Sequence, residues 1–241
     1  MKCIIPLFIL LMTPTPSVPA ADRSHEEMTS LLDRRIPALM ERYDIPGAVV
    51  ALIREGKTVW TAAYGQADPA KDTPMTVDTH CRVESISKSV TAWGVMRLVE
   101  QGRIDLDAPV TNYLKSWKFP PSPFPVKKVT TRLLLSQSAG MPLGTIGVRY
   151  APTERKPSLR ESLYRDAVLM REPGRSFSYS NAGFNLLELL VEEVTGRDFA
   201  EYMRTEVLLP LGMRHSSYEW RADMHPPVPP GHDTNGRAVP V

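Results

Sequence analysis

The sequence has few cysteines, and this excludes a fold held together by disulfides. Its 241 residues include two, Cys3 and Cys81, and Cys3 lies in an N-terminal segment that we expect to be removed. One remaining cysteine cannot form an intramolecular disulfide, and a chain of this length buries enough apolar surface to fold without one. We interpret Cys81 as a small buried core residue rather than as a nucleophile.

The sequence also lacks a long apolar run and an excess of charge of one sign. The apolar stretch from Cys3 to Met12 is shorter than the roughly 20 residues that span a bilayer. Lys2 precedes it, and Val18-Pro19-Ala20 follows, which is the layout of a secretory signal. We predict a signal peptide at 1–20 and a secreted or periplasmic mature chain without a transmembrane segment. The net charge of +2 does not indicate a nucleic-acid partner.

Several catalytic motifs are missing. There is no Gly-x-Ser-x-Gly elbow, no phosphate-binding glycine loop and no His-Glu-x-x-His. His225, His232 and Asp233 lie in a proline-rich tail at irregular spacing. We interpret them as solvated loop residues and predict no metal site.

The N-terminal third of the mature chain predicts a helix and a β-hairpin. Ser24 and Glu27 have capping-box spacing, and apolar residues at helical intervals predict a helix over 25–43, which Pro37 should kink or split. Apolar runs at 48–53 and 58–64 around a glycine-containing turn predict the hairpin. Because the first run has no polar alternation, we expect that strand to be buried on both faces, with a helix layer on each.

The rest of the chain is predicted to be mostly helical. The apolar spacing favours helices at about 85–101, 110–114, 130–137, 159–170, 182–195 and 199–209, and Pro120, Pro121, Pro123 and Pro125 mark a stiff surface loop. No strand pattern follows Gly212. A lone hairpin is marginally stable, so the predicted sheet is incomplete.

Ser85 and Lys88 have the spacing of a nucleophile and its base. Residues three apart lie on the same face of a helix. Backbone N–H groups at a helix N-terminus stabilise an oxyanion and disfavour an ammonium group nearby. A neutral Lys88 can therefore take the proton of Ser85, and the Ser85 N–H can form half of an oxyanion hole.

Tyr179 and Asn181 add a second proton carrier and an amide. A phenol with a pKa near 10 acts as a base at neutral pH only beside positive charge, which Lys88 can provide. Asn181 faces the same side as Tyr179 if the segment is extended, and its amide can donate to a substrate carbonyl and accept from Lys88. Ser-x-x-Lys is expected about once by chance in a chain of this length and Tyr-x-Asn nearly as often, mostly as solvated surface residues, so only their combination is specific.

Longer stretches around these residues resemble a known superfamily. The segments 83–92 and 100–110 resemble the nucleophile region of the serine β-lactamase and penicillin-binding-protein superfamily, in its class C and esterase-like branch. The segment 133–142 is similar to the helix and turn that follow it, and 177–183 resembles the tyrosine motif. The similarity extends from about Ile45 to Arg237.

The resemblance implies an α/β (α+β) fold in which a helical region lies beside an antiparallel sheet, with the site at their junction. We expect one β-lactamase-like domain over 21–241. Within it, 21–80 form the helix and hairpin of the sheet part, 81–212 form the mostly helical part, and 213–241 form a proline-rich tail without the last strands.

The resemblance also implies roles for the four candidate residues. Ser85 would form an acyl-enzyme, Lys88 and Tyr179 would move protons, and Asn181 would bind a small-molecule or peptide substrate. That substrate would be an ester, a β-lactam or a D-amino-acid peptide. No metal or organic cofactor is implied.

One family motif has no match. The third motif, Lys-Thr-Gly or His-x-Gly, supplies the second oxyanion N–H, and neither triplet follows Tyr179. Thr195-Gly196 is preceded by Val194 and ends a predicted helix. Three interpretations therefore stay open: an active serine hydrolase, an impaired or non-catalytic member that only binds ligand, and a piece of a longer enzyme.

Overall fold

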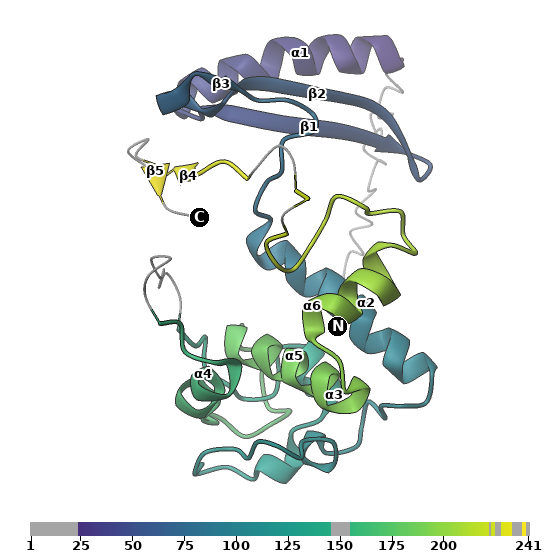
Figure 1. The fold of residues 1–241 in the computed structure, drawn as a ribbon, viewed down its shortest axis with the longest axis vertical. Coiled ribbons are helices and arrows are strands. Elements are labelled where there is room, and N and C mark those ends of the chain that lie inside the picture. Colours follow the sequence, from purple (N-terminus) through teal and green to yellow (C-terminus); the bar gives the residue numbers. More distant parts are fainter. Residues whose placement is uncertain (1–23, 146–154, 222, 225–227, 233–237, 240–241) are drawn as a thin grey trace, which may run out of the picture.

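The computed structural model describes residues 24–145, 155–221, 223–224, 228–232 and 238–239. Figure 1 shows a sheet part, formed by α1 and β1–β3, beside a mostly helical part, which agrees with the predicted combination of helices and antiparallel sheet. The predicted signal peptide at 1–20 lies outside the described residues. Within the described ranges, every helix is too short or too polar to cross a membrane.

Helix α1 (His25–Arg42) begins at the predicted capping box. The Glu27 N–H donates to Ser24 Oγ at 3.2 Å, and the Ser24 N–H donates to the Glu27 carboxylate at 3.1 Å. The helix continues through Pro37 as one element, so the prediction of a split is wrong. Contacts on both sides of Pro37 hold the helix to the sheet: Tyr64 Oη donates to Asp33 at 2.6 Å, and Met40 is buried.

The predicted hairpin is confirmed as strands β1 (Gly47–Arg54) and β2 (Lys57–Asp68). The two residues that join them, Glu55 and Gly56, both have positive φ, 49° and 73°. This is the backbone of the tight turn whose twist matches antiparallel strands. A two-residue strand, β3 (Thr73–Pro74), pairs with β2 and completes the order β1-β2-β3.

The expectation that β1 is buried on both faces is wrong. Its residues alternate, with Ala48, Val50 and Leu52 half-buried and the residues between them exposed. Ala48 pairs with Tyr64, whose phenol reaches α1, so the half-buried face is the one that α1 covers. Among the described residues no helix covers the opposite face, where Ile53 is 63% exposed.

The helical part contains the predicted helices with altered ends. The 3₁₀ turn η2 (Glu84–Ile86) leads into α2 (Ser87–Glu100), and α3 (Thr131–Leu135), α4 (Leu159–Asp166), α5 (Asn181–Thr195) and α6 (Phe199–Met203) follow, the last continuing into a π-helical turn, η5 (Arg204–Leu208). The stretch predicted at 110–114 is only a 3₁₀ turn, η3 (Val110–Asn112), and another 3₁₀ turn, η4 (Val126–Lys128), ends the proline-rich loop.

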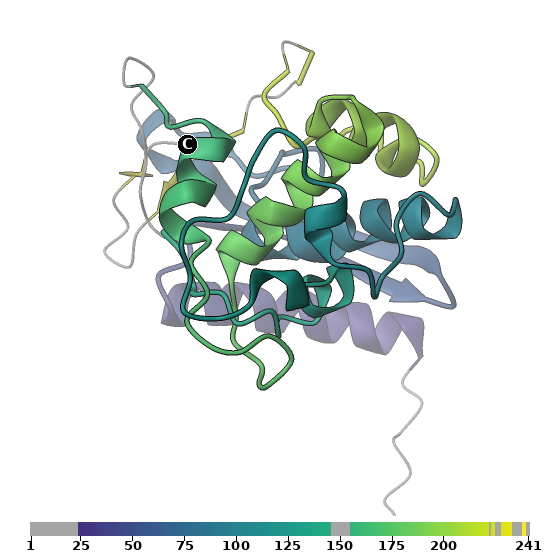
Figure 2. The ribbon, with the colours of Figure 1, turned by 90° about the horizontal axis from the view of Figure 1, so that it is seen from below.

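Helix α5 lies at the centre of the helical part, as Figures 1 and 2 show from two directions. It contacts α2, α3, α4 and α6, and Leu186, Leu187, Leu189 and Leu190 on it are fully buried. It ends at Gly196, which adopts the left-handed conformation with φ 70°. The core of the molecule is therefore built around this helix.

Two short strands occur where none was predicted. β4 (Gly231–His232) pairs with β5 (Ala238–Val239) in the tail, and within the described chain neither joins the β1–β3 sheet. Pairs of two residues among prolines carry no hydrophobic alternation, which explains why the sequence did not indicate them.

Candidate active site

Ser85 Oγ contacts both predicted proton carriers. Lys88 Nζ donates to it at 3.2 Å, and Tyr179 Oη donates to it at 2.7 Å. Lys88 lies one helical turn away, whereas Tyr179 comes from the segment just before α5. The structure thus brings together the three residues that the sequence singled out as catalytic.

The backbone around Ser85 positions it at the start of a helix. Glu84, directly before it, has φ 44°, a left-handed conformation that residues other than glycine rarely adopt. The η2 turn then continues into α2, so Ser85 lies within the first helical turn. Backbone N–H groups there have no partners within the helix and form the positive end of its dipole.

Gln137 holds the segment that carries Tyr179. Its backbone carbonyl accepts from the Ser178 N–H at 2.7 Å, and its side-chain Oε1 accepts from the Ser180 N–H at 2.8 Å. Both neighbours of Tyr179 are therefore fixed to the turn after α3. Gln137 itself has φ 58°, and no sequence signal indicated this positioning role.

The charge of Lys88 acts on Tyr179. Lys88 Nζ lies 4.9 Å from the centre of the Tyr179 ring and 5.8 Å from that of Phe184. Hydrogen bonding with Lys88 and with Ser85 lowers the pKa of the Tyr179 phenol, although burial opposes the shift. The shift favours the phenolate, which is the form that can accept a proton from Ser85.

Asn181 is the first residue of α5, and its backbone N–H donates to the Leu143 carbonyl at 2.9 Å. Ser180 between it and Tyr179 is extended, with φ −139° and ψ 121°, and residues that flank an extended residue point to the same side. Within the described part of the chain, no hydrogen bond joins the Asn181 amide to Lys88. Its role in substrate binding stays a prediction.

Comparison with known proteins places the chain in a family. The family model described as Beta-lactamase matches residues 32–241. The chain belongs to the Beta-lactamase family. Its curated relatives include esterase EstB of Burkholderia gladioli, 33% identical over 193 residues, which are 75% of this chain and 49% of that protein. Protein flp of Staphylococcus aureus strain N315 is 27% identical over 191 residues, 78% of this chain and 38% of that protein.

Solved structures of the Beta-lactamase fold are similar. An octameric penicillin-binding protein homologue from Pyrococcus abyssi matches with a TM-score of 0.72 and 29% identity over 88% of this chain and 50% of that one. EstCE1, a hydrolase with promiscuous acyltransferase activity, matches with a TM-score of 0.72 and 26% identity over 89% of this chain and 60% of that one. The chain spans about half the length of the relatives it matches.

Within this Beta-lactamase-family chain, Cys81 is not the buried core residue that we expected. It is exposed, in the loop between β3 and η2, and its thiol donates to the Thr79 carbonyl at 3.7 Å. Partial burial of the thiol raises its pKa, which keeps it protonated at neutral pH. The sulfur is therefore not activated as a nucleophile.

A cavity of about 300 Å³ extends to Glu84, the residue before Ser85, and its lining does not include Ser85, Lys88 or Tyr179. Its walls come from the sheet part, the loop before Ser85 and the tail, and they include Gln66, His80, Cys81, Glu84 and His232. Among the described residues, no group of three potential metal ligands occurs here or elsewhere. Two members of the tail cluster considered above, His225 and Asp233, lie outside the described residues.

Proposed function

We propose that the protein is a serine hydrolase that forms an acyl-enzyme on Ser85, with a carboxylic ester as its first substrate class and β-lactams or D-amino-acid peptides as related acyl donors. The observation that carries the proposal is the contact of one hydroxyl, Ser85 Oγ, with both Lys88 Nζ and Tyr179 Oη. Esterase EstB and the hydrolase EstCE1 among the similar proteins support the choice of an ester. The proposal includes export directed by residues 1–20.

The geometry supports a two-step reaction. The Tyr179–Lys88 pair takes the proton of Ser85 as Oγ attacks the carbonyl carbon, and the N–H groups of the first helical turn stabilise the oxyanion. The tetrahedral intermediate collapses, the ester C–O bond breaks, and the leaving alcohol receives the proton. Water then attacks the acyl-enzyme, gives its proton to the same pair and releases the acid, while Ser85 recovers its hydrogen.

A second candidate function is ligand binding without turnover. It is favoured by one sequence observation, the lack of Lys-Thr-Gly or His-x-Gly after Tyr179. Removing one oxyanion donor costs on the order of 100- to 1000-fold in rate, so an enzyme with half of its oxyanion hole would turn over slowly.

Covalent labelling tests the proposal. The purified protein is treated with a fluorophosphonate or a fluorescent penicillin beside Ser85→Ala and a matched control, Ser89→Ala, a residue on α2 whose hydroxyl donates to the Ile86 carbonyl at 2.7 Å. We expect the wild-type protein and Ser89→Ala to be labelled and Ser85→Ala to remain unlabelled. Equal labelling of all three would remove Ser85 as the nucleophile. Steady-state ester hydrolysis that disappears in Ser85→Ala would contradict binding without turnover.

A further inference from the structure

A tyrosine from outside the recognised motifs contacts the helix that carries the nucleophile. Tyr218 lies in the segment after η5, and its Oη donates to the Ser87 carbonyl at 2.8 Å. The same phenol lies 3.0 Å from Thr91 Oγ1, which is itself 2.9 Å from the Ser87 carbonyl. The three groups form a closed polar cluster against the first turn of α2, and Thr91 is buried.

This contact acts on the backbone directly before Lys88. The carbonyl of Ser87 and the N–H of Lys88 belong to one peptide unit, which is planar. A hydrogen bond that fixes the Ser87 carbonyl therefore fixes the orientation of the peptide plane that precedes the Lys88 Cα, and with it the direction of the Lys88 side chain. That side chain spans one helical turn back to Ser85 Oγ, a contact of 3.2 Å that a small rotation of the plane would lengthen.

The surroundings of Tyr218 hold its ring in place and keep its hydroxyl a donor. The ring packs edge-on against Phe199, with centres 5.0 Å apart and planes at 82°, and Phe199 is itself buried at the start of α6. Burial raises the pKa of Tyr218, the hydrogen bond with Thr91 opposes part of this shift, and the charge of Glu188 adds the smallest increase. The phenol stays protonated at neutral pH and can donate to the carbonyl.

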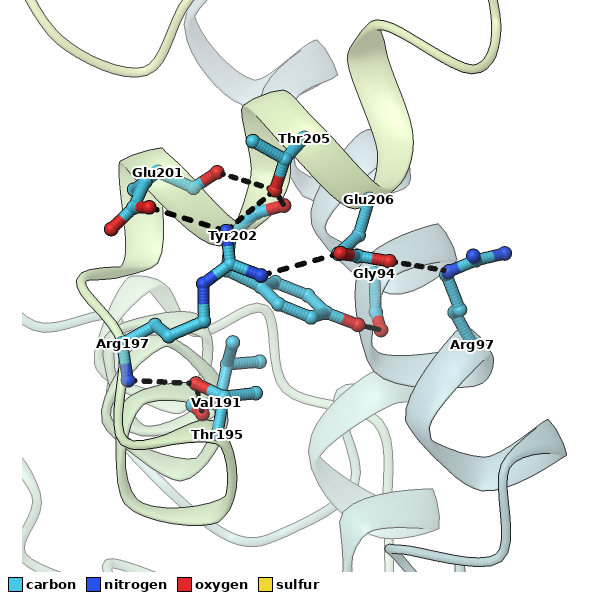
Figure 3. A network of polar contacts seen from close by, with 9 residues as sticks. All are labelled: Gly94, Arg97, Val191, Thr195, Arg197, Glu201, Tyr202, Thr205 and Glu206. Carbon is cyan, nitrogen blue, oxygen red and sulfur yellow. Dashed lines mark hydrogen bonds and ion pairs between the residues drawn. The ribbon is translucent and has the colours of Figure 1, made fainter.

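A second tyrosine makes the same kind of bond further along α2. Tyr202 Oη donates to the Gly94 carbonyl at 2.9 Å, and Glu206 beside it pairs with Arg97 at 3.3 Å (Figure 3). Both phenols thus anchor α2 to the segments that follow α5. Only the bond of Tyr218 reaches the turn that holds Ser85 and Lys88.

From these contacts we infer that Tyr218 is a positioning residue that holds Lys88 against Ser85 by fixing the Ser87–Lys88 peptide. The inference deepens the proposed function and rests on it. It assigns to Tyr218 a role in the proton transfer that activates Ser85, whereas Tyr202 serves only to stabilise the fold.

The test compares Tyr218→Phe with Tyr202→Phe, two variants that each remove one hydroxyl from a bond to the α2 backbone. The rate of Ser85 acylation by a fluorescent penicillin is measured over a range of concentrations, with thermal unfolding as a check on folding. For Tyr218→Phe we expect a maximal acylation rate about tenfold lower, at an unchanged half-saturating concentration. Tyr202→Phe should acylate within twofold of the wild-type rate although it is destabilised. Wild-type acylation by Tyr218→Phe, or an equal loss in both variants, would overturn the inference.

A second readout does not depend on catalysis. Reductive ¹³C-methylation of lysines gives an NMR signal for Lys88, assigned by its loss in Lys88→Arg. Tyr218→Phe should move this signal, and Tyr202→Phe should leave it in place. An unmoved signal in Tyr218→Phe would overturn the inference even if the protein is active. A wild-type protein that resists labelling would contradict the proposed function alone.

Discussion

The sheet part and the helical part of this protein are stabilised in different ways. Nearly all of the buried hydrophobic residues belong to the helical part, where they form one core around α5. In the described sheet part, from α1 to β3, only Met40 and Ala67 are buried hydrophobic residues. The sheet also exposes Val49, Ile53 and Val59, which are 38%, 63% and 39% accessible.

This difference indicates which part of the molecule positions the candidate site. Ser85, Lys88 and Tyr179 all lie on the helical part, and Gln137 and Tyr218, which hold their backbones, lie there too. The sheet part contributes walls of the neighbouring cavity, through residues such as Gly47 and Gln66. Ser85 is therefore positioned by the part of the molecule that has its own core.

The largest expected loss in the free energy of unfolding comes from truncating a core side chain of the helical part. Leu190 on α5 is fully buried, so Leu190→Ala removes apolar contacts and leaves a cavity, and we expect a loss of about 2 to 5 kcal/mol in the free energy of unfolding. The matched change in the sheet part, Ile53→Ala at an exposed position, should cost about 0.5 kcal/mol or less. Urea unfolding measures both. Equal losses of unfolding free energy in Leu190→Ala and Ile53→Ala would show that the exposed sheet face is covered in solution.

The second prediction concerns a half-buried carboxyl in the helical part. Burial, with the nearby charges of Glu192 and Asp198, raises the pKa of Glu188 to about 7. The unfolded carboxyl ionises near pH 4.5, so between pH 4.5 and 7 the folded state binds more protons and the free energy of unfolding falls as the pH rises. Glu188→Gln should abolish this fall, a change of up to about 3 kcal/mol across the window.

Unfolding curves at pH 4.5, 6 and 8 check the Glu188 prediction. The exposed residue Glu100 serves as a control, and Glu100→Gln should follow the wild-type pH profile. If the unfolding free energies of Glu188→Gln and of the wild-type protein change in parallel with pH, the folded state does not hold the Glu188 carboxyl in its protonated form, and the prediction is wrong.

The smallest effect tests the attachment of α1 to the sheet. Burial and the hydrogen bond to Asp33 raise the pKa of Tyr64 to about 12, so its phenol remains a donor at neutral pH. Tyr64→Phe should lower the free energy of unfolding by about 1 kcal/mol because this bond is lost. Tyr43→Phe, at the C-cap of the same helix and at a residue that is 61% exposed, should change stability little. A larger loss in Tyr43→Phe than in Tyr64→Phe would contradict the proposed attachment.

Sequence patterns predicted the elements whose causes are local. The capping box before α1, the glycine-containing hairpin turn and the glycine that ends α5 each depend on a few neighbouring residues, and each was found where the pattern indicated. The strand β1 was misjudged because an apolar run does not reveal how many of its faces another element covers. Cys81 was misjudged for the same reason, since its exposure depends on the loop in which it lies.

Residue spacing alone predicted that Ser85 and Lys88 share a helical turn, because positions three apart lie on one face whatever surrounds the helix. The hydrogen bond of Tyr179 to Ser85 and that of Tyr218 to the Ser87 carbonyl depend on tertiary packing. They join residues that are 94 and 131 positions apart in the chain. Such contacts arise from the packing of whole elements around α5, and no local pattern encodes that packing. The proximity of Ser85 and Lys88 thus follows from the sequence, and the rest of the candidate site follows from the fold.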